Sequence, residues 1–253
     1  MMSIALFLFA HQDDEFGVFQ KIIDELADGR EVYCAYLTDG VSVGCSPKVR
    51  NLESITVLTK LGVPRKNILF VGEELIIPDG KLVNHLKKAK VWLTSWLSEN
   101  AQIENIYLPA WEGGHPDHDS LHAVGVIVTK QLNLIDKVWQ FPLYNGYKCK
   151  GQFFRVLLTL ASNGEVFNRK ISWLNRCRFL SFILNYPSQA STWAGLAPFV
   201  LIHYLVYGTQ SLQRVSFSQI QLPPHLGRLY YERRKFCTWQ VMSERLRGDL
   251  LVS

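Results

Sequence analysis

The chain has 253 residues, of which 48% are hydrophobic and 19% are charged, and it has no low-complexity tract. This composition excludes a disordered or fibrous protein and predicts one large globular domain rather than two small ones. The five cysteines are scattered without a CxxC pair, so we expect no disulfide framework and a reducing, cytoplasmic location. The apolar start lacks a basic n-region and a cleavage motif, which favours a strand over a signal peptide.

The net charge of +5 is unevenly distributed along the chain. Residues 1–149 carry 14 basic and 18 acidic side chains, whereas residues 150–253 carry 13 basic and 4 acidic ones. The basic excess therefore belongs to the C-terminal part. It predicts an acidic partner such as a phosphate, an anionic glycan or an anionic membrane surface; the alternative is a solvated basic face.

Strand-like and helix-like segments alternate over the first 147 residues. Apolar runs predict strands, and segments with helical spacing between them predict helices, with Gly62 as a C-cap. The strands are expected at 3–10, 31–40, 67–72, 103–110 and 136–144, and the helices at 15–29, 47–63, 80–100 and 117–133. This order predicts βαβ units, that is, a Rossmann-like three-layer α/β sandwich with a mainly parallel sheet. No GxGxxG or Walker A pattern indicates a nucleotide site.

The pattern becomes irregular after residue 147. We interpret residues 148–253 as a partly helical, substrate-specifying elaboration of a core at about 1–147, the whole forming a single domain. Residues 179–213 lack Lys, Arg, Asp and Glu, but prolines interrupt them and their most apolar part is too short to span a bilayer. Core packing is the favoured interpretation, and contact with a membrane or a lipid-linked substrate is the alternative.

Two polar clusters follow the first and fourth predicted strands, as "HQDDE" (11–15) and "WEGGHPDHDSLH" (111–122). Ligands of such sheets bind beyond the carboxyl ends of the strands. A divalent cation would offset the repulsion among the crowded acids. One His and one Asp from the first cluster and one His from the second would supply a catalytic zinc, and a remaining carboxylate would act as general base. The alternatives are a helix N-cap for the first cluster and a turn histidine for the second.

The motifs resemble those of a known family. "AHQDDE" resembles the AHPDDE signature of the PIG-L/LmbE-like zinc-dependent de-N-acetylases, and "HPDH" matches their second signature. "TDG" at 38–40, Arg50 with Glu53, and Leu61 with Gly62 also resemble the family pattern. The agreement covers residues 4 to about 147.

The resemblance implies a role for each matching residue. His11, Asp14 and His118 would be the zinc ligands. Asp13 would be the general base that deprotonates the zinc-bound water, and His115 would stabilise the tetrahedral oxyanion.

The resemblance also implies supporting residues around this set. Asp117 would orient a neighbouring histidine, and Arg50 would bind the sugar. Glu15 is expected to brace the loop. His122 is expected to lie behind the metal ligands and not to bind the ion itself. Gln12 departs from the family, which usually has Pro there; this departure concerns the rigidity of the loop and not the ligands.

The implied activity is removal of the N-acetyl group from an N-acetylglucosamine-type sugar in a glycoconjugate, such as a lipid-linked or lipopolysaccharide glycan. The cofactor would be Zn²⁺, and Fe²⁺ could occupy the same ligands. A small soluble glycoside of thiol or antibiotic biosynthesis is the alternative substrate. A metal-dependent phosphoester hydrolase and a non-catalytic glycan-binding protein are the alternative functions. We expect no nucleic-acid partner; peripheral contact with the inner face of an anionic membrane stays open, and the sequence does not predict an oligomeric state.

Overall fold

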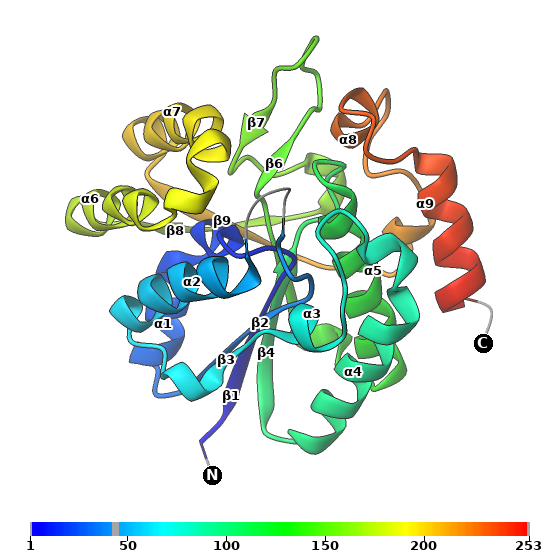
Figure 1. Cartoon of the computed structure of the whole chain (residues 1–253), viewed down its shortest axis with the longest axis horizontal. Helices are drawn as coiled ribbons and strands as arrows, with labels where there is room; N and C mark the ends of the chain where they lie inside the picture. Colours follow the sequence, from blue (N-terminus) through cyan, green and yellow to red (C-terminus); the bar gives the residue numbers. More distant parts are fainter. Residues whose placement is uncertain (1, 42–45, 252–253) are drawn as a thin grey trace.

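A seven-stranded sheet forms the centre of the computed structural model, which describes residues 2–41 and 46–251 (Figure 1). The strand order is β3-β2-β1-β4-β5-β9-β8. The first five are parallel, whereas β9 runs antiparallel to β5, and β8 to β9. The strands span Ile4–Phe9 (β1), Glu31–Tyr36 (β2), Ile68–Leu69 (β3), Ile103–Pro109 (β4), Val138–Phe141 (β5), Val166–Lys170 (β8) and Thr209–Arg214 (β9). The predicted α/β sandwich with a mainly parallel sheet is confirmed.

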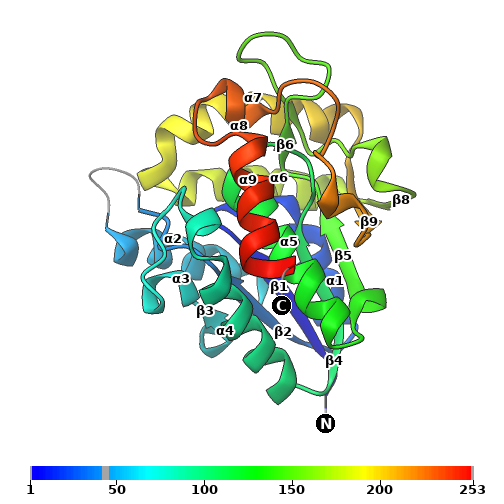
Figure 2. The same cartoon turned by 90° about the vertical axis from the view of Figure 1, so that its right-hand side faces the viewer.

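Strand β1 lies in the middle of the sheet, and all six of its residues are buried. Because side chains alternate along a strand, Phe7 and Phe9 join one core and Leu6 and Leu8 join the other. One face is covered by α1 (Phe19–Ala27), α2 (Pro47–Leu61), α6 (Trp173–Phe182) and α7 (Ala190–Val206), and the other by α4 (Leu86–Glu99), α5 (Pro116–Gln131) and α9 (Trp239–Leu246). Figures 1 and 2 show these three layers from two sides.

Some predicted elements have different bounds. The strand expected at 67–72 is only β3, because α3 (Val71–Glu74) starts directly after it. The helix expected at 80–100 is split into a 3₁₀ turn (Leu82–Asn84) and α4. Gly62 has the left-handed φ of 110° expected of a C-cap residue, which confirms the predicted end of α2.

The C-terminal part contributes to the same sheet through β8 and β9, which the sequence did not predict. It also forms α6, α7, α9, the short α8 (Tyr230–Arg233) and strand β7 (Arg155–Val156), which pairs with β6 (Tyr144–Asn145). The four cysteines in the described residues are free, and Cys45 lies outside them.

Helix α7 comes from the uncharged segment and has two different faces. Trp193, Val200 and Tyr204 are buried in the core, whereas Ile202 and Leu205 are exposed. Core packing therefore accounts for one face of this helix. Within residues 2–41 and 46–251, no helix has the length and apolar character needed to cross a membrane.

Candidate active site

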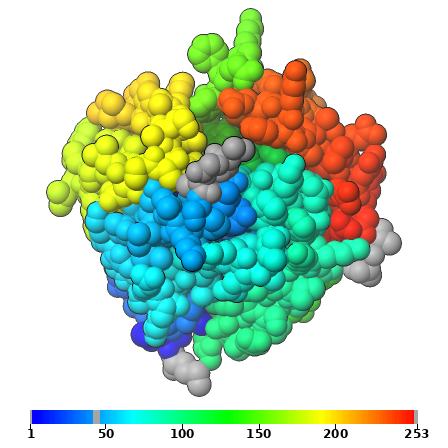
Figure 3. Space-filling view, in the orientation of Figure 1, coloured from blue at the N-terminus to red at the C-terminus, as the bar shows by residue number. Residues whose placement is uncertain are grey.

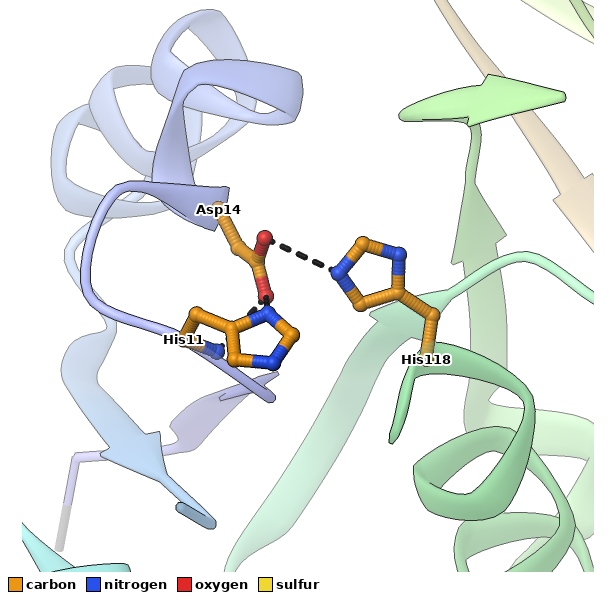
Figure 4. A group of neighbouring side chains, drawn as sticks. All are labelled: His11, Asp14 and His118. Atoms are coloured by element: carbon orange, nitrogen blue, oxygen red, sulfur yellow. Dashed lines mark hydrogen bonds and ion pairs between the residues drawn. The ribbon is translucent and has the colours of Figure 1, made fainter. Parts of the chain in front are cut away.

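The two polar clusters meet at the carboxyl edge of the sheet. The first follows β1, and the second follows β4, the neighbour of β1 in the sheet. His11 and Asp14 come from the first loop, and His118 comes from the first turn of α5 (Figure 4). All three are buried, and each offers a ligand atom within 4.8 Å of the others. The three ligands implied by the resemblance are thus brought together.

The backbone fixes the orientation of the Asp14 carboxylate. Its Oδ2 atom accepts hydrogen bonds from the backbone N–H groups of Ala10 (2.9 Å) and His11 (2.8 Å). Its Oδ1 atom lies 3.1 Å from Nε2 of His118. Although burial raises the pKa of Asp14, the nearby His118 and His11 lower it well below its usual range, so the carboxylate stays ionised.

The donor chemistry fits a divalent cation. Nε2 of His11 lies 3.1 Å from Oδ2 of Asp117, and a carboxylate oxygen only accepts, so Nε2 carries a proton there. In the neutral ring, Nδ1 of His11 therefore carries the lone pair, and it faces Asp14 at 3.6 Å, where it can bind an ion. Two imidazoles and one carboxylate are a common catalytic zinc set, and a carboxylate behind a ligating histidine is its usual support. His11, Asp14 and His118 therefore fit zinc.

Asp117 is fully buried and belongs to the support of the site. Besides contacting His11, it accepts hydrogen bonds from the backbone N–H groups of Gly80 (2.6 Å) and Leu82 (2.9 Å). It thereby ties α5 to the loop after α3. Its contact with His11 has the geometry expected of a residue that orients a ligand.

Asp79 is a site residue that the sequence analysis missed. Its Oδ1 lies 3.2 Å from Nε2 of His11, and its Oδ2 lies 3.5 Å from Nη1 of Arg50. His11, Asp79 and His115 form a second group whose donor atoms are close together. This group shares His11 with the first, and its Asp79 is already paired with Arg50, so we favour the first group as the ion site. The only signal for Asp79 in the sequence is the Pro78-Asp-Gly turn.

Asp13 has a strained backbone, with φ at 132°. The Glu15 carboxylate stabilises this conformation, because its Oε2 accepts the N–H of Asp13 at 2.9 Å and its Oε1 accepts the hydroxyl of Tyr186 at 2.8 Å. The predicted bracing position of Glu15 is therefore observed. Burial raises the pKa of Asp13 to about 8, while Arg50 opposes that rise. The strain directs a buried carboxylate into the pocket.

Arg50 is almost completely buried and supports the loop. One of its nitrogens donates to the carbonyl of Gln12 at 2.7 Å and lies 3.4 Å from Oδ1 of Asp13. Its other terminal nitrogen contacts the carbonyl of Gly40 and the carboxylate of Asp79. The guanidinium lines the pocket, yet its charge is already compensated. This geometry favours a positioning role over the sugar-binding role that the resemblance implies.

His115 is the N-cap residue of α5 and lines the pocket. Its Nδ1 accepts the N–H of Asp117 at 3.2 Å, so in the neutral ring the proton is on Nε2. Burial lowers the pKa of His115 to about 3. A neutral ring with an Nε2–H group is suited to donate a hydrogen bond in the pocket.

Gln12 replaces the family's proline with a hydrogen-bonded amide. Its Nε2 donates to Oδ1 of Asn51 at 2.8 Å, and Nδ2 of Asn51 donates to Oε2 of Glu73 at 2.6 Å. The side chain is buried and fills the space beside Gly40, where an added Cβ would collide with Oε1 of Gln12. The amide thus links the first loop to α2.

The second loop is held by Glu112. Its Oε1 accepts the N–H groups of Leu143 (2.7 Å) and Tyr144 (2.9 Å), and its Oε2 accepts Nδ2 of Asn145 at 3.1 Å. Gly114 allows the close approach, since a Cβ there would collide with the carbonyl oxygen of Tyr144. These contacts place the ring of Tyr144 5.5 Å from the ring of His118.

His122 and Tyr147 do not line the pocket. His122 is buried behind the site, with Nδ1 2.8 Å from the carbonyl of Pro109. Tyr147 packs against His225, with ring centroids 5.3 Å apart. Tyr144, in contrast, lines the pocket.

The site lies at the floor of a pocket of about 420 Å³. Figure 3 shows the molecule hollowed between α7, the β6–β7 hairpin and α8. The floor of the pocket is formed by His11, Asp13, Asp14, Arg50, Asp79 and His115. The walls of the pocket include Tyr144, Phe154, Thr192, Leu196, Tyr230, Arg234 and Phe236. Most of the wall residues come from the C-terminal part, which the family motifs do not cover.

Comparison with protein families identifies the part of the chain that carries the site. The model of the GlcNAc-PI de-N-acetylase family, PIG-L, matches residues 6–129. Residues 6–129 belong to the PIG-L family. The match includes both signatures and confirms the resemblance seen in the sequence. A search of curated protein sequences found no match.

Solved structures share the fold of this chain. A deacetylase of teicoplanin biosynthesis is 15% identical, with a TM-score of 0.64 over 85% of this chain and 98% of that chain. The N,N'-diacetylchitobiose deacetylase of Pyrococcus horikoshii is 17% identical, with a TM-score of 0.61 over 88% of each chain. A conserved protein of Thermus thermophilus is 18% identical, with a TM-score of 0.60 over 88% and 96%. At these identities the likeness concerns the fold.

Proposed function

We propose that this chain is a zinc-dependent hydrolase that removes the acetyl group from an N-acetylated amino sugar. The PIG-L match supports a de-N-acetylase. One observation carries the proposal: the buried donors of His11, Asp14 and His118 converge, and His11 and Asp14 line one pocket together with Asp13 and His115. An ion bound there would polarise the amide carbonyl and lower the pKa of a bound water.

The remaining steps belong to side chains of the pocket. Asp13 accepts a proton from the attacking water in its ionised form, which the charge of an ion bound beside it would favour against the pKa rise caused by burial. Its strained backbone keeps the side chain at the pocket. The Nε2–H group of His115 donates a hydrogen bond to the oxyanion that develops on the former carbonyl oxygen. Burial raises the pKa of the Tyr144 hydroxyl, so this group stays protonated and can donate a second hydrogen bond. Asp117 keeps His11 oriented, and Arg50 and Glu15 keep Asp13 in position.

The substrate is an N-acetylglucosamine-type sugar in a larger glycoconjugate. Two solved structures of this fold are a deacetylase of teicoplanin biosynthesis and the N,N'-diacetylchitobiose deacetylase of Pyrococcus horikoshii. The pocket volume lies in the range that holds drug-sized ligands. A small soluble glycoside remains the alternative substrate.

Acetate release from a panel of N-acetylated sugars, measured together with metal content, tests this proposal. We expect one zinc per chain and acetate release that a chelator abolishes. Fe²⁺ in the native protein would change the identity of the ion but not the proposed reaction. Phosphate release from phosphoesters would favour a phosphoester hydrolase. Stoichiometric binding of a glycan without turnover would favour the glycan-binding alternative.

Peripheral contact with an anionic membrane, on the cytoplasmic side, stays a prediction. The exposed face of α7 carries Leu201, Ile202, Leu205 and Val206, and the C-terminal part is basic. Exposed apolar side chains on a basic protein suit an anionic bilayer surface. We expect flotation with vesicles that contain phosphatidylglycerol, reduced by Leu205→Glu but not by Val91→Glu on α4. Absence of flotation would reject membrane contact.

A further inference from the structure

The outer wall of the pocket carries a cation without a carboxylate partner. Arg234 lines the pocket and is exposed, and the structure of residues 2–41 and 46–251 gives its side chain no ion pair. The floor is different, because Arg50 is paired with both Asp13 and Asp79. Among the described residues that line the pocket, Arg234 is therefore the arginine whose charge is available to a ligand.

The neighbours of Arg234 in sequence are occupied elsewhere. Glu232 accepts the backbone N–H groups of Leu229 and Trp239, both at 2.9 Å, and is thereby held away from Arg234. Arg233 donates to the backbone carbonyls of the β6–β7 hairpin, including that of Cys149 at 2.9 Å. Two adjacent arginines thus have different surroundings: Arg233 anchors the hairpin, and Arg234 faces the pocket.

Aromatic side chains place the guanidinium of Arg234 within reach of the catalytic floor. Its Cζ lies 5.7 Å from the ring centroid of Phe236, a cation–π distance that holds the side chain in orientation. The Phe236 ring in turn lies 5.6 Å from the ring of His115. One sugar ring with its glycosidic substituent can bridge the separation between Arg234 and His115.

We propose that Arg234 binds an anionic group, a phosphodiester or a carboxylate, that the substrate carries on the far side of its N-acetyl sugar. The sugar stacks between the aromatic wall and α7, with its acetamido group at the floor. The anion then neutralises the positive charge of Arg234 on the outer wall of the pocket. The basic excess of residues 150–253 adds long-range attraction for such a substrate.

Ligands that share the N-acetyl sugar and differ in the charge of the group attached to it test this inference. The turnover probes are N-acetylglucosamine linked through a methyl phosphodiester, its carboxymethyl glycoside and its neutral methyl glycoside. The binding probes are the corresponding free amines with the zinc-loaded protein. Only the turnover arm rests on the proposed function. The two anionic probes distinguish a phosphate from a carboxylate.

We expect the wild type to prefer one anionic probe over the neutral one by about tenfold in kcat/KM and in affinity, the effect of one charge-assisted contact. Arg234→Gln should abolish that preference and change the neutral probe less than twofold, while Arg234→Lys should retain part of it. Arg245→Gln, an exposed arginine on α9, should change nothing. Salt should weaken binding of the anionic probe in the wild type only.

The outcomes separate the two proposals. Equal affinity of the wild type for charged and neutral amines, including no measurable affinity for either, would overturn the anion site. An equal loss for both probes in Arg234→Gln would also overturn it. Arg234-dependent binding of the anionic amine without acetate release would keep the anion site and reject the hydrolase. Acetate release that Arg234→Gln leaves unchanged for every probe would keep the hydrolase and reject the anion site.

Discussion

Oδ2 of Asp117 lies 3.1 Å from Nε2 of His11, and this contact determines which nitrogen of the imidazole faces Asp14. A fully buried carboxylate that accepts from Nε2–H leaves Nδ1 as the nitrogen available to an ion. The same carboxylate accepts two backbone N–H groups, so it is itself held in place. The contacts of Asp117 thus fix the orientation of His11, the proposed metal ligand.

Asp117→Asn should weaken zinc binding by about 10- to 100-fold, because the amide replaces a charged acceptor behind His11. Competition with a chromophoric chelator measures this affinity. Asp136→Asn, an exposed change far from the site, is the control. Unchanged zinc affinity in a folded Asp117→Asn protein would show that Asp117 does not support the ligand.

Zinc should stabilise the wild type against unfolding by about 3 kcal/mol when its free concentration is 100-fold above Kd. His118→Ala should lose this effect, because one of three protein ligands is removed. Thermal melting with and without zinc measures the difference, and His122→Ala tests the adjacent histidine outside the set. The same zinc-dependent shift in His118→Ala and the wild type would contradict the assigned site.

The amide of Gln12 and the side chain of Asn51 should be coupled by about 1 kcal/mol, as expected of one buried hydrogen bond. A double-mutant cycle with Gln12→Ala and Asn51→Ala, followed by urea unfolding, gives this coupling. Gln12→Pro, which restores the family's residue, should keep zinc affinity while lowering stability. Additive effects of the two alanine substitutions would remove the proposed link between the loop and α2.

Glu112→Ala should lower the free energy of unfolding by about 3 kcal/mol, since it leaves three buried donors without their acceptor. It should also reduce activity through Tyr144, which loses its anchored backbone. The midpoint of urea unfolding measures the stability effect, with the exposed Glu165→Ala as control. A midpoint equal to that of the control would refute this anchoring role.

Much of the fold and the floor of the site could be predicted from the sequence. The apolar run at 3–10 and the polar residues after it place His11 and Asp14 at the carboxyl edge of the sheet. The neighbouring strand β4 brings His118 to the same edge. These features depend on local patterns and on a general rule for parallel sheets, so they need no knowledge of distant contacts.

The walls and Asp79 could not be predicted in this way. Asp79 reaches His11 through a turn after the short α3, and nothing local distinguishes it from a surface aspartate. Strands β8 and β9 were not predicted because β8 is exposed along its whole length and β9 is mostly polar. Neither strand therefore shows a buried apolar run. Arg234 reaches the pocket only because α8 packs beside the β6–β7 hairpin, a contact between distant segments.

Asp13→Asn gives the most direct test of the proposed hydrolase, because it removes the base while keeping the size of the side chain. Zinc content and acetate release are measured on the same purified sample, beside the wild type and His11→Ala. We predict one zinc per chain and at least a hundredfold lower kcat for Asp13→Asn, consistent with the effect of a general base. For His11→Ala we predict loss of both zinc and activity. Full acetate release by zinc-loaded Asp13→Asn would contradict the account.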